Sequence, residues 1–238
     1  MNTTMLFRIC TVAIVATCML ACGRSEEMPS SYFPLQEGLE WKYWVVSETP
    51  YERNESELQI TNAGLWEAGN QQYHIRKTNT GNYYYIQDRN DGIVRSSKRT
   101  IVEPSPRFGV AERYVIKYPL QAGTQWSYKA KPYLLARHAP TANELKEIVK
   151  YQMDWEIVSN DVKLSVPAGE FENCLYVQGK ALVEVPRALG VATDQVLFET
   201  NEWYAPNVGL VKVVHEEKSY SDQAYGGSIS LVLMSFEN

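Results

Sequence analysis

Four cysteines and three histidines are the side chains of this 238-residue chain best suited to bind a metal or to act as nucleophiles. The histidines, His74, His138 and His215, stand far apart, with no cysteine or carboxylate at a metal-ligand spacing. No HExxH, GxSxG, SxxK, P-loop or GxGxxG pattern occurs. We therefore expect no metal site, no cofactor and no enzymatic activity.

Cys22 is the one cysteine with a clear chemical context. It directly follows Ala21 at the end of an apolar run over residues 9–20, and Arg8 is the only charge before that run. This layout is typical of a signal peptide, because a dozen apolar residues are too few to span a bilayer, which requires about 20. We predict export, with residues 1–21 as the signal peptide.

The segment Met19-Leu20-Ala21-Cys22-Gly23 resembles the lipobox of bacterial lipoproteins. The resemblance implies cleavage after Ala21 and attachment of acyl chains such as palmitate to Cys22, so that the membrane becomes a partner of the protein. In that family, Asp after the cysteine retains the protein in the inner membrane. Gly23 therefore implies the outer membrane if the source is Gram-negative. A poorer lipobox ending at Cys18, and plain secretion with cleavage near Ala21, are the alternatives.

The remaining chain divides into a tether and one domain. Residues 22–31 are mostly small and polar, as in a flexible tether, and residues 32–238 show strands of similar spacing throughout, which predicts a single antiparallel β domain. The formal net charge of −5 argues against nucleic-acid binding. Cys174 is the only cysteine beyond the leader and the anchor, so no internal disulfide can form, and we expect a small buried hydrophobe there.

A near-repeat is the most informative internal feature. Pro34–Tyr43 (PLQEGLEWKY) recurs as Pro119–Tyr128 (PLQAGTQWSY). Pro ends a preceding ladder, Gly permits a turn with positive φ, and Trp and Tyr two residues apart share one face of a strand. We interpret each copy as a turn that starts a strand and is anchored by buried aromatic residues; a two-fold ligand site is the less favoured alternative. These anchors are Trp41, Tyr43, Trp126 and Tyr128.

The rest of the chain alternates between strand-like runs and turns. Hairpins are predicted at 72–77 with 83–88, 162–166 with 171–177 and 196–204 with 209–214, followed by a last strand at 228–234. Apolar residues alternate with polar ones over 151–157, which indicates a sheet with one wet face. The prediction is a mainly-β fold: one curved antiparallel sheet or half-barrel with at most one or two short helices, one of them over 142–149.

Two irregular segments, 103–111 and 186–195, are predicted to be long loops and the rim of any binding site. Arg95, Lys98 and Arg99 are expected on a solvated strand face. The adjacent acids Glu216 and Glu217 should point to opposite faces of a strand, which disfavours joint acid–base chemistry.

Three segments together resemble a group of bacterial envelope proteins of the TapB-like type. They are residues 34–43, 166–171 and 203–212. That group is in turn similar to the half-barrels of the lipoprotein carriers LolA and LolB. The resemblance implies a concave apolar groove and assigns no catalytic residue.

These observations lead to one expected function and two alternatives. The predicted anchor, the 16 Tyr, 6 Trp and 6 Phe, and the missing motifs favour a non-enzymatic envelope lipoprotein that binds a hydrophobic ligand or an envelope protein. The alternatives are an anchored structural subunit or scaffold of a surface assembly, and an enzyme with an unrecognised site.

Overall fold

The computed structural model describes residues 31–109, 112–135, 150–186, 193–220 and 226–237, which form twelve β-strands. The first six are β1 (Glu40–Glu48), β2 (Arg53–Ala68), β3 (Gln71–Thr78), β4 (Asn82–Arg89), β5 (Gly92–Thr100) and β6 (Arg113–Lys117). The second six are β7 (Gln125–Ala130), β8 (Tyr151–Val166), β9 (Gly169–Pro186), β10 (Thr193–Ala205), β11 (Gly209–Ser219) and β12 (Gly226–Glu237).

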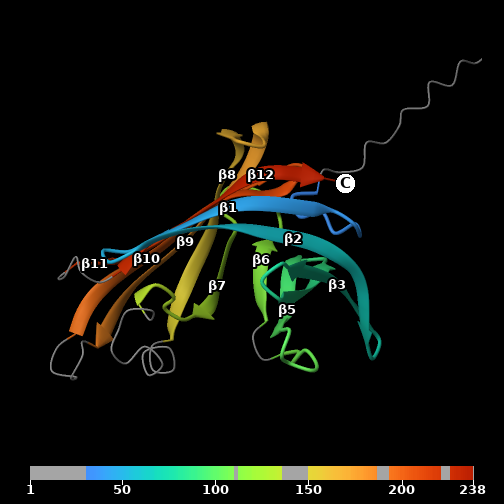
Figure 1. The fold of residues 1–238 in the computed structure, drawn as a ribbon, viewed down its shortest axis with the longest axis horizontal. Helices are drawn as coiled ribbons and strands as arrows, with labels where there is room; N and C mark the ends of the chain where they lie inside the picture. The colour runs from blue at the N-terminus through green and yellow to red at the C-terminus, as the bar shows by residue number, and fades with distance from the viewer. Residues whose placement is uncertain (1–30, 110–111, 136–149, 187–192, 221–225, 238) are drawn as a thin grey trace, which may run out of the picture.

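All twelve strands belong to one antiparallel sheet in the order β6-β5-β4-β3-β2-β1-β12-β11-β10-β9-β8-β7. Neighbours in the sheet are neighbours in sequence, except where the first strand pairs with the last. The sheet curves into a nearly closed, barrel-like shell (Figure 1). This confirms the predicted mainly-β, antiparallel fold. Among the described residues, no helix is long and apolar enough to cross a membrane.

The side-chain pattern of β8 explains how the sheet buries one face. Tyr151, Met153, Trp155 and Ile157 are buried in the main core, whereas Gln152 and Asp154 between them are exposed, as predicted. On a strand, successive side chains point to opposite faces, so this alternation fixes which face of the sheet is concave.

The two copies of the near-repeat occupy equivalent places. Gly38 and Gly123 have φ of 91° and 88°, a conformation that glycine adopts without a Cβ clash. The amide of Gly38 donates to the carbonyl of Asn62 (3.0 Å), and the amide of Gly123 donates to that of Ile157 (2.8 Å). Each turn therefore docks on the following long strand, β2 or β8. The sheet can be divided into two six-stranded halves, β1–β6 and β7–β12.

The halves are joined differently at their two contacts. β1 and β12 form a full backbone ladder. β6 and β7 are the two ends of the strand order, and among the described residues no ladder pairs them. Side chains link them instead, since Nη1 of Arg113 donates to the Tyr128 hydroxyl (2.7 Å). We call this β6/β7 junction the seam.

The prediction that 186–195 is a long loop needs correction. Residues 193–195 and Pro186 are paired strand residues of β10 and β9, so the segment 186–195 is not wholly a loop. The described part of 103–111 is irregular as predicted, but its Phe108 stacks on Tyr73 (4.2 Å between centroids) and packs edge-on against Tyr85. The predicted helix over 142–149 lies outside the described residues.

Candidate functional site

An interior cavity of about 320 Å³ lies between the two halves of the sheet. One part of its wall is apolar and the other carries charge. Its apolar wall includes Tyr43, Leu58, Ile60, Val115, Leu210 and Leu231. Its polar wall includes Arg76, Tyr84, Arg95, Arg113, Tyr128 and Glu202. No described residue of 103–111 or 186–195 lines it, so the predicted binding rim stays a prediction; Phe108 packs against Tyr85 of β4.

Arg95 and Arg113 form the most unusual part of the wall. They are direct partners in the β5–β6 ladder, with two positive charges opposed across one pair of strands. Arg95 has no hydrogen bond or ion pair with any described residue, and its Nε is buried without a partner. Burial, and then repulsion from Arg113, lower the pKa of Arg95 to about 10. Such an arrangement is costly unless another group satisfies it.

A β-bulge in β5 places Arg95 and Lys98 on the same face of the sheet. The β4–β5 register shifts between Tyr85 and Ile86, so that Lys98 pairs with Tyr84 and Arg95 pairs with Ile86. Tyr84 and Ile86 share the inner face, and their partners Arg95 and Lys98 share it too, although they are three residues apart. Nζ of Lys98 lies 5.5 Å from the centre of the Tyr84 ring. Of the three residues predicted on a solvated face, Lys98 is exposed, whereas Arg95 and Arg99 are partly buried.

Arg76 serves the structure rather than a ligand. Its Nε donates to Asn62 (3.0 Å) and its Nη2 to the carbonyl of Pro34 (2.9 Å). Its guanidinium also lies 4.0 Å from the centre of the Phe33 ring and 4.5 Å from that of Trp41. Burial lowers its pKa to about 10, but its donors are largely satisfied.

Glu202 is the acid of the cavity wall. Its carboxylate accepts a hydrogen bond from the hydroxyl of Tyr204. Burial raises the pKa of Glu202, while the Tyr204 hydrogen bond and the charge of Arg113 oppose that rise. The wall thus has an excess of positive charge around Arg95 and Arg113, with one acid whose ionisation is disfavoured.

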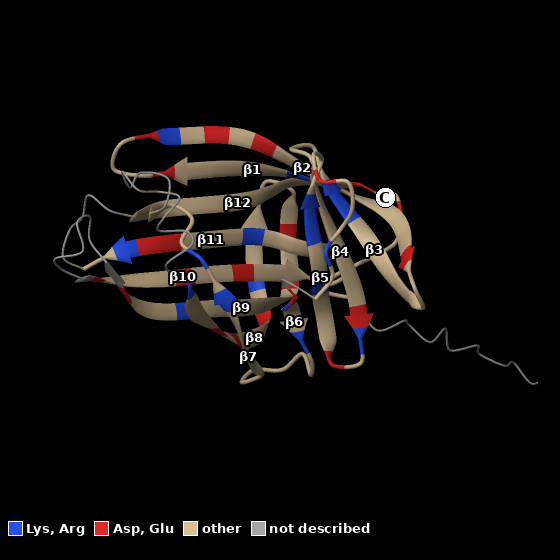
Figure 2. Ribbon diagram, turned by 90° about the horizontal axis from the view of Figure 1, so that it is seen from below, with Lys and Arg blue, Asp and Glu red and all other residues tan. Residues whose placement is uncertain are grey.

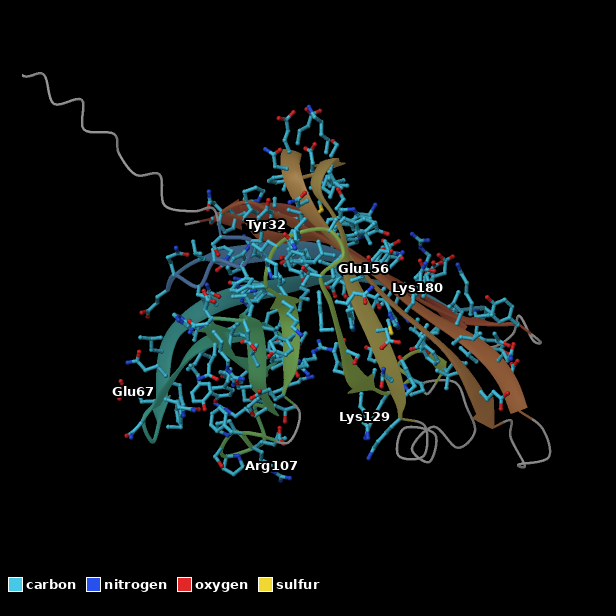
Figure 3. All side chains as sticks on the ribbon, turned by 180° about the vertical axis from the view of Figure 1, so that it is seen from behind. Tyr32, Glu67, Arg107, Lys129, Glu156 and Lys180 are labelled. Atoms are coloured by element: carbon cyan, nitrogen blue, oxygen red, sulfur yellow. The ribbon has the colours of Figure 1, made fainter. Side chains whose placement is uncertain are left out.

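A second cavity of about 530 Å³ opens at the seam and shares Arg95, Arg113 and Tyr128 with the interior cavity. Lys129 and Lys131 add positive charge to it. Lys129 lies near one end of the fold and Tyr32 near the other (Figure 3). The three shared side chains therefore lie between the interior cavity and the cavity at the seam.

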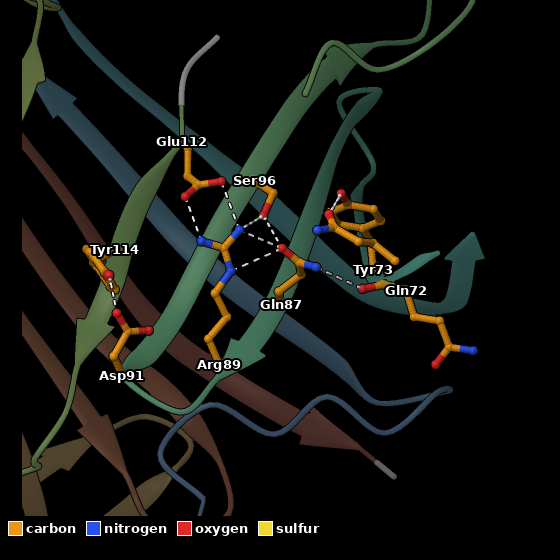
Figure 4. Close-up of polar contacts among 9 residues, drawn as sticks. Gln72, Tyr73, Gln87, Arg89, Asp91, Ser96, Glu112 and Tyr114 are labelled. Carbon is orange, nitrogen blue, oxygen red and sulfur yellow. Dashed lines mark hydrogen bonds and ion pairs between the residues drawn. The ribbon is translucent and has the colours of Figure 1, made fainter. Parts of the chain in front are cut away.

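Glu112, the acid of the seam cavity, is already engaged. Arg89 binds it through two hydrogen bonds of 2.6 and 2.9 Å, and Gln87 and Ser96 hold the guanidinium in place (Figure 4). This bond lowers the pKa of Glu112. β5 and β6 themselves carry basic residues and no acidic one (Figure 2). The seam therefore presents cations that Glu112 does not neutralise.

Glu217 is a second buried acid, with a structural role. Its carboxylate accepts the backbone amides of Tyr133 (2.7 Å) and Leu135 (2.8 Å) and contacts His215 Nε2 (3.2 Å). Glu217 is fully buried, whereas Glu216 lies on the other face beside Lys218 (2.9 Å), as predicted for adjacent acids. Glu217 fastens the segment after β7 to β11.

The repeat residues and Cys174 lie outside the cavity wall or only partly on it. Ala21 and Cys22 lie outside the described residues, so cleavage and lipidation stay predictions. Trp41, Tyr43 and Trp126 are buried, and Tyr128 is partly buried at the seam. Cys174 is buried in the second core cluster, as expected, and burial raises the pKa of its thiol. In the ranges that the structure describes, His, Cys, Asp and Glu form no group of three that could hold a metal.

No protein-family model and no curated protein matches this chain. Two solved structures align with most of it. One is a candidate lipoprotein from Parabacteroides distasonis, with 16% identity, a TM-score of 0.43, and coverage of 89% of this chain and 100% of the other. The other is a candidate exported protein with a YmcC-like fold from Bacteroides fragilis, with 16% identity, a TM-score of 0.39, and coverage of 88% and 100%. Neither assigns a ligand or an activity to this chain, and the resemblance to TapB-like proteins, LolA and LolB stays a prediction.

Proposed function

We propose that this is a lipid-anchored protein of the bacterial cell envelope that binds a small hydrophobic molecule in its interior cavity and does not act on it chemically. The cavity carries the proposal, because a concave space with an apolar wall and a few polar groups is the usual form of a small-molecule site. Tyr43, Leu58 and Leu231 supply apolar surface there.

The leader supports the envelope location. The lipobox at Cys22 and Gly23 in place of Asp fit an acylated protein of the outer membrane in a Gram-negative source. A tether of nine residues between Cys22 and Tyr32 would reach about 30 Å when extended, enough to hold the sheet clear of the headgroups.

Binding of a neutral apolar dye tests this function. The full chain carrying Cys22→Ser, which has no acyl chain of its own, is titrated with N-phenylnaphthylamine, and its fluorescence is followed. We expect saturable binding that Leu58→Trp, a cavity-filling change, abolishes. Leu65→Trp is the matched control, because Leu65 lies on the same strand but is 55% exposed.

Two results would overturn the proposal. One is the absence of saturable dye binding by the Cys22→Ser chain. The other is equal loss of binding in the Leu58→Trp and Leu65→Trp variants, which would place the dye outside the cavity. Native mass spectrometry of the same chain adds a second readout, since a co-purifying small molecule would appear as a discrete mass increment.

A further inference from the structure

Three buried N–H donors lack an acceptor among the described residues, and all belong to strands near the seam. They are Nε of Arg95 on β5, Nε1 of Trp126 on β7 and Nε1 of Trp155 on β8. Buried donors in native proteins are almost always paired, so each such exception requires an explanation. Trp155 has the Tyr128 hydroxyl close by, and Trp126 lines neither of the two cavities that Arg95 lines, so Nε of Arg95 is the donor that points to an absent acceptor group at the seam.

The two copies of the near-repeat sharpen this observation. In the first copy, Nε1 of Trp41 donates to the carbonyl of Val208 (2.7 Å) and the Tyr43 hydroxyl donates to that of Leu210 (2.8 Å). In the second copy, Trp126 has no such bond, and the Tyr128 hydroxyl accepts from Arg113. The first copy lies beside the closed β1–β12 ladder and the second beside the open seam. At the seam, therefore, Trp126 and Tyr128 donate to no backbone carbonyl of the described residues, and cations lie beside them.

We propose that the seam is the entrance for an acid-bearing amphiphile, a molecule with one carboxylate or phosphate group on an apolar body. Its acid binds between Arg95 and Arg113, and its apolar body extends along Leu58, Ile60 and Leu231. This rests on the proposed function, which it narrows from any hydrophobic molecule to an anionic one.

The chemistry of the two arginines favours an anion over a neutral polar head. A guanidinium carries five N–H donors in a planar fork that matches the oxygens of carboxylate and phosphate. Nε of Arg95 is buried without a partner in the described chain, and Arg113 uses one donor for Tyr128. An anion between them would cancel the repulsion of the opposed pair and satisfy Nε of Arg95.

The surrounding charges direct the anion to this point. Lys98 faces the same side of the sheet near Tyr84, and Lys129 lies on the seam cavity. Of the acids near the route, Glu112 is bound by Arg89, and Glu202 has a raised pKa beside Tyr204. Positive charge therefore gathers where the interior cavity and the seam cavity share Arg95 and Arg113.

The test compares three ligands with the same chain, octanoate, octyl phosphate and octanol, as competitors of N-phenylnaphthylamine on the Cys22→Ser protein. We expect one or both acids to displace the dye at concentrations at least about tenfold lower than octanol does. A ratio of about tenfold corresponds to the lower end of the free energy of a hydrogen bond to a charged group. The acid that displaces the dye at the lower concentration identifies the headgroup as carboxylate or phosphate.

Arg95→Met then removes the preference for acids and leaves dye and octanol binding in place. Arg95→Lys, which keeps the charge without the fork, gives an intermediate loss and guards against misfolding of the first variant. Arg53→Met is the matched control, since Arg53 is exposed and pairs only with Glu48 and Glu55. Equal displacement by acids and octanol, or an acid preference that survives Arg95→Met, would overturn the inference while dye binding still upheld the proposed function.

Discussion

Arg95 of β5 and Arg113 of β6 face each other directly across one antiparallel ladder, and only Arg113 has a hydrogen-bond partner. Like charges directly opposed on a sheet destabilise it, and a buried cation without a partner adds a desolvation cost. Natural sequences that break such a local rule often do so at functional or strained sites. The pair is thus a stability deficit located at the proposed binding site.

Replacing Arg95 should stabilise the ligand-free protein. In Arg95→Met the apolar stem remains while the opposed charge disappears, so we expect the free energy of unfolding to rise by about 1 kcal/mol. Urea unfolding at neutral pH measures it, with Arg53→Met, expected within about 0.5 kcal/mol of the parent, as the surface control. A large loss of stability in Arg95→Met would show that the guanidinium has a structural partner.

Removing either repeat tryptophan should destabilise the fold strongly. Trp41 is 1% exposed and Trp126 is 7% exposed, so Trp41→Ala and Trp126→Ala should each cost about 3–5 kcal/mol through the cavity that is left. Denaturant unfolding of each variant gives the value. A cost below roughly 1 kcal/mol at either position would mean that this tryptophan contributes little to the core.

Phenylalanine substitutions of the two tryptophans of the near-repeat should differ in their cost to the free energy of unfolding. Trp41→Phe keeps an aromatic ring but leaves the carbonyl of Val208 without its indole donor, which adds about 1–2 kcal/mol to the packing loss. Trp126→Phe removes a donor that has no acceptor, so only the packing loss remains. The two differences in unfolding free energy are compared directly. Equal costs would imply that Trp126 has found an acceptor in solution.

Glu202 predicts a particular pH dependence. Its pKa is raised in the folded protein, so between the usual carboxyl pKa of about 4.3 and that raised value the folded state holds more protons than the unfolded state. The unfolding free energy should therefore fall as pH rises through this window. Glu202→Gln should flatten the profile, measured by urea unfolding from about pH 4 to about pH 7. An unchanged slope would assign the dependence to other acids.

Gly179 gives a prediction about the aromatic wall of the cavity. A Cβ at this position would lie 2.8 Å from the ring of Trp155, closer than packed atoms approach. Gly179→Ala should therefore displace the ring and cost about 1–3 kcal/mol. Unfolding and tryptophan fluorescence report the two effects, with exposed Lys180→Ala as the neighbouring control. Native-like fluorescence with no loss of stability would mean that the ring has room to shift.

The sheet itself was predictable from local patterns. The alternation around Trp155 in β8 and the glycine turns at Gly38 and Gly123 depend on backbone geometry that a short segment specifies by itself. The order of the strands could not be predicted from local patterns, because the β1–β12 ladder joins segments that are far apart in the sequence.

The candidate site could not be predicted, because a β-bulge decides which side Arg95 occupies. Simple alternation would place Arg95 and Lys98 on opposite faces, yet the register shift in β4–β5 puts both on the face of Tyr84, with Arg95 partly buried and Lys98 exposed. Two consecutive serines, Ser96 and Ser97, are both buried at this point. Their pairing in the sequence is the only local signal of the bulge, and it is too common to identify one.

The start of the described chain has a mechanical consequence. The amide of Ser31 donates to the side chain of Asn207 and its carbonyl accepts from the amide of Asn207, which clamps the chain to the β10–β11 turn. Trp41 and Tyr43 hold the strand residues after that turn. Tension from a lipid on Cys22 would thus load this clamp first. The seam lies near Lys129, away from Tyr32 and this clamp (Figure 3), so the pull would reach it only through the sheet.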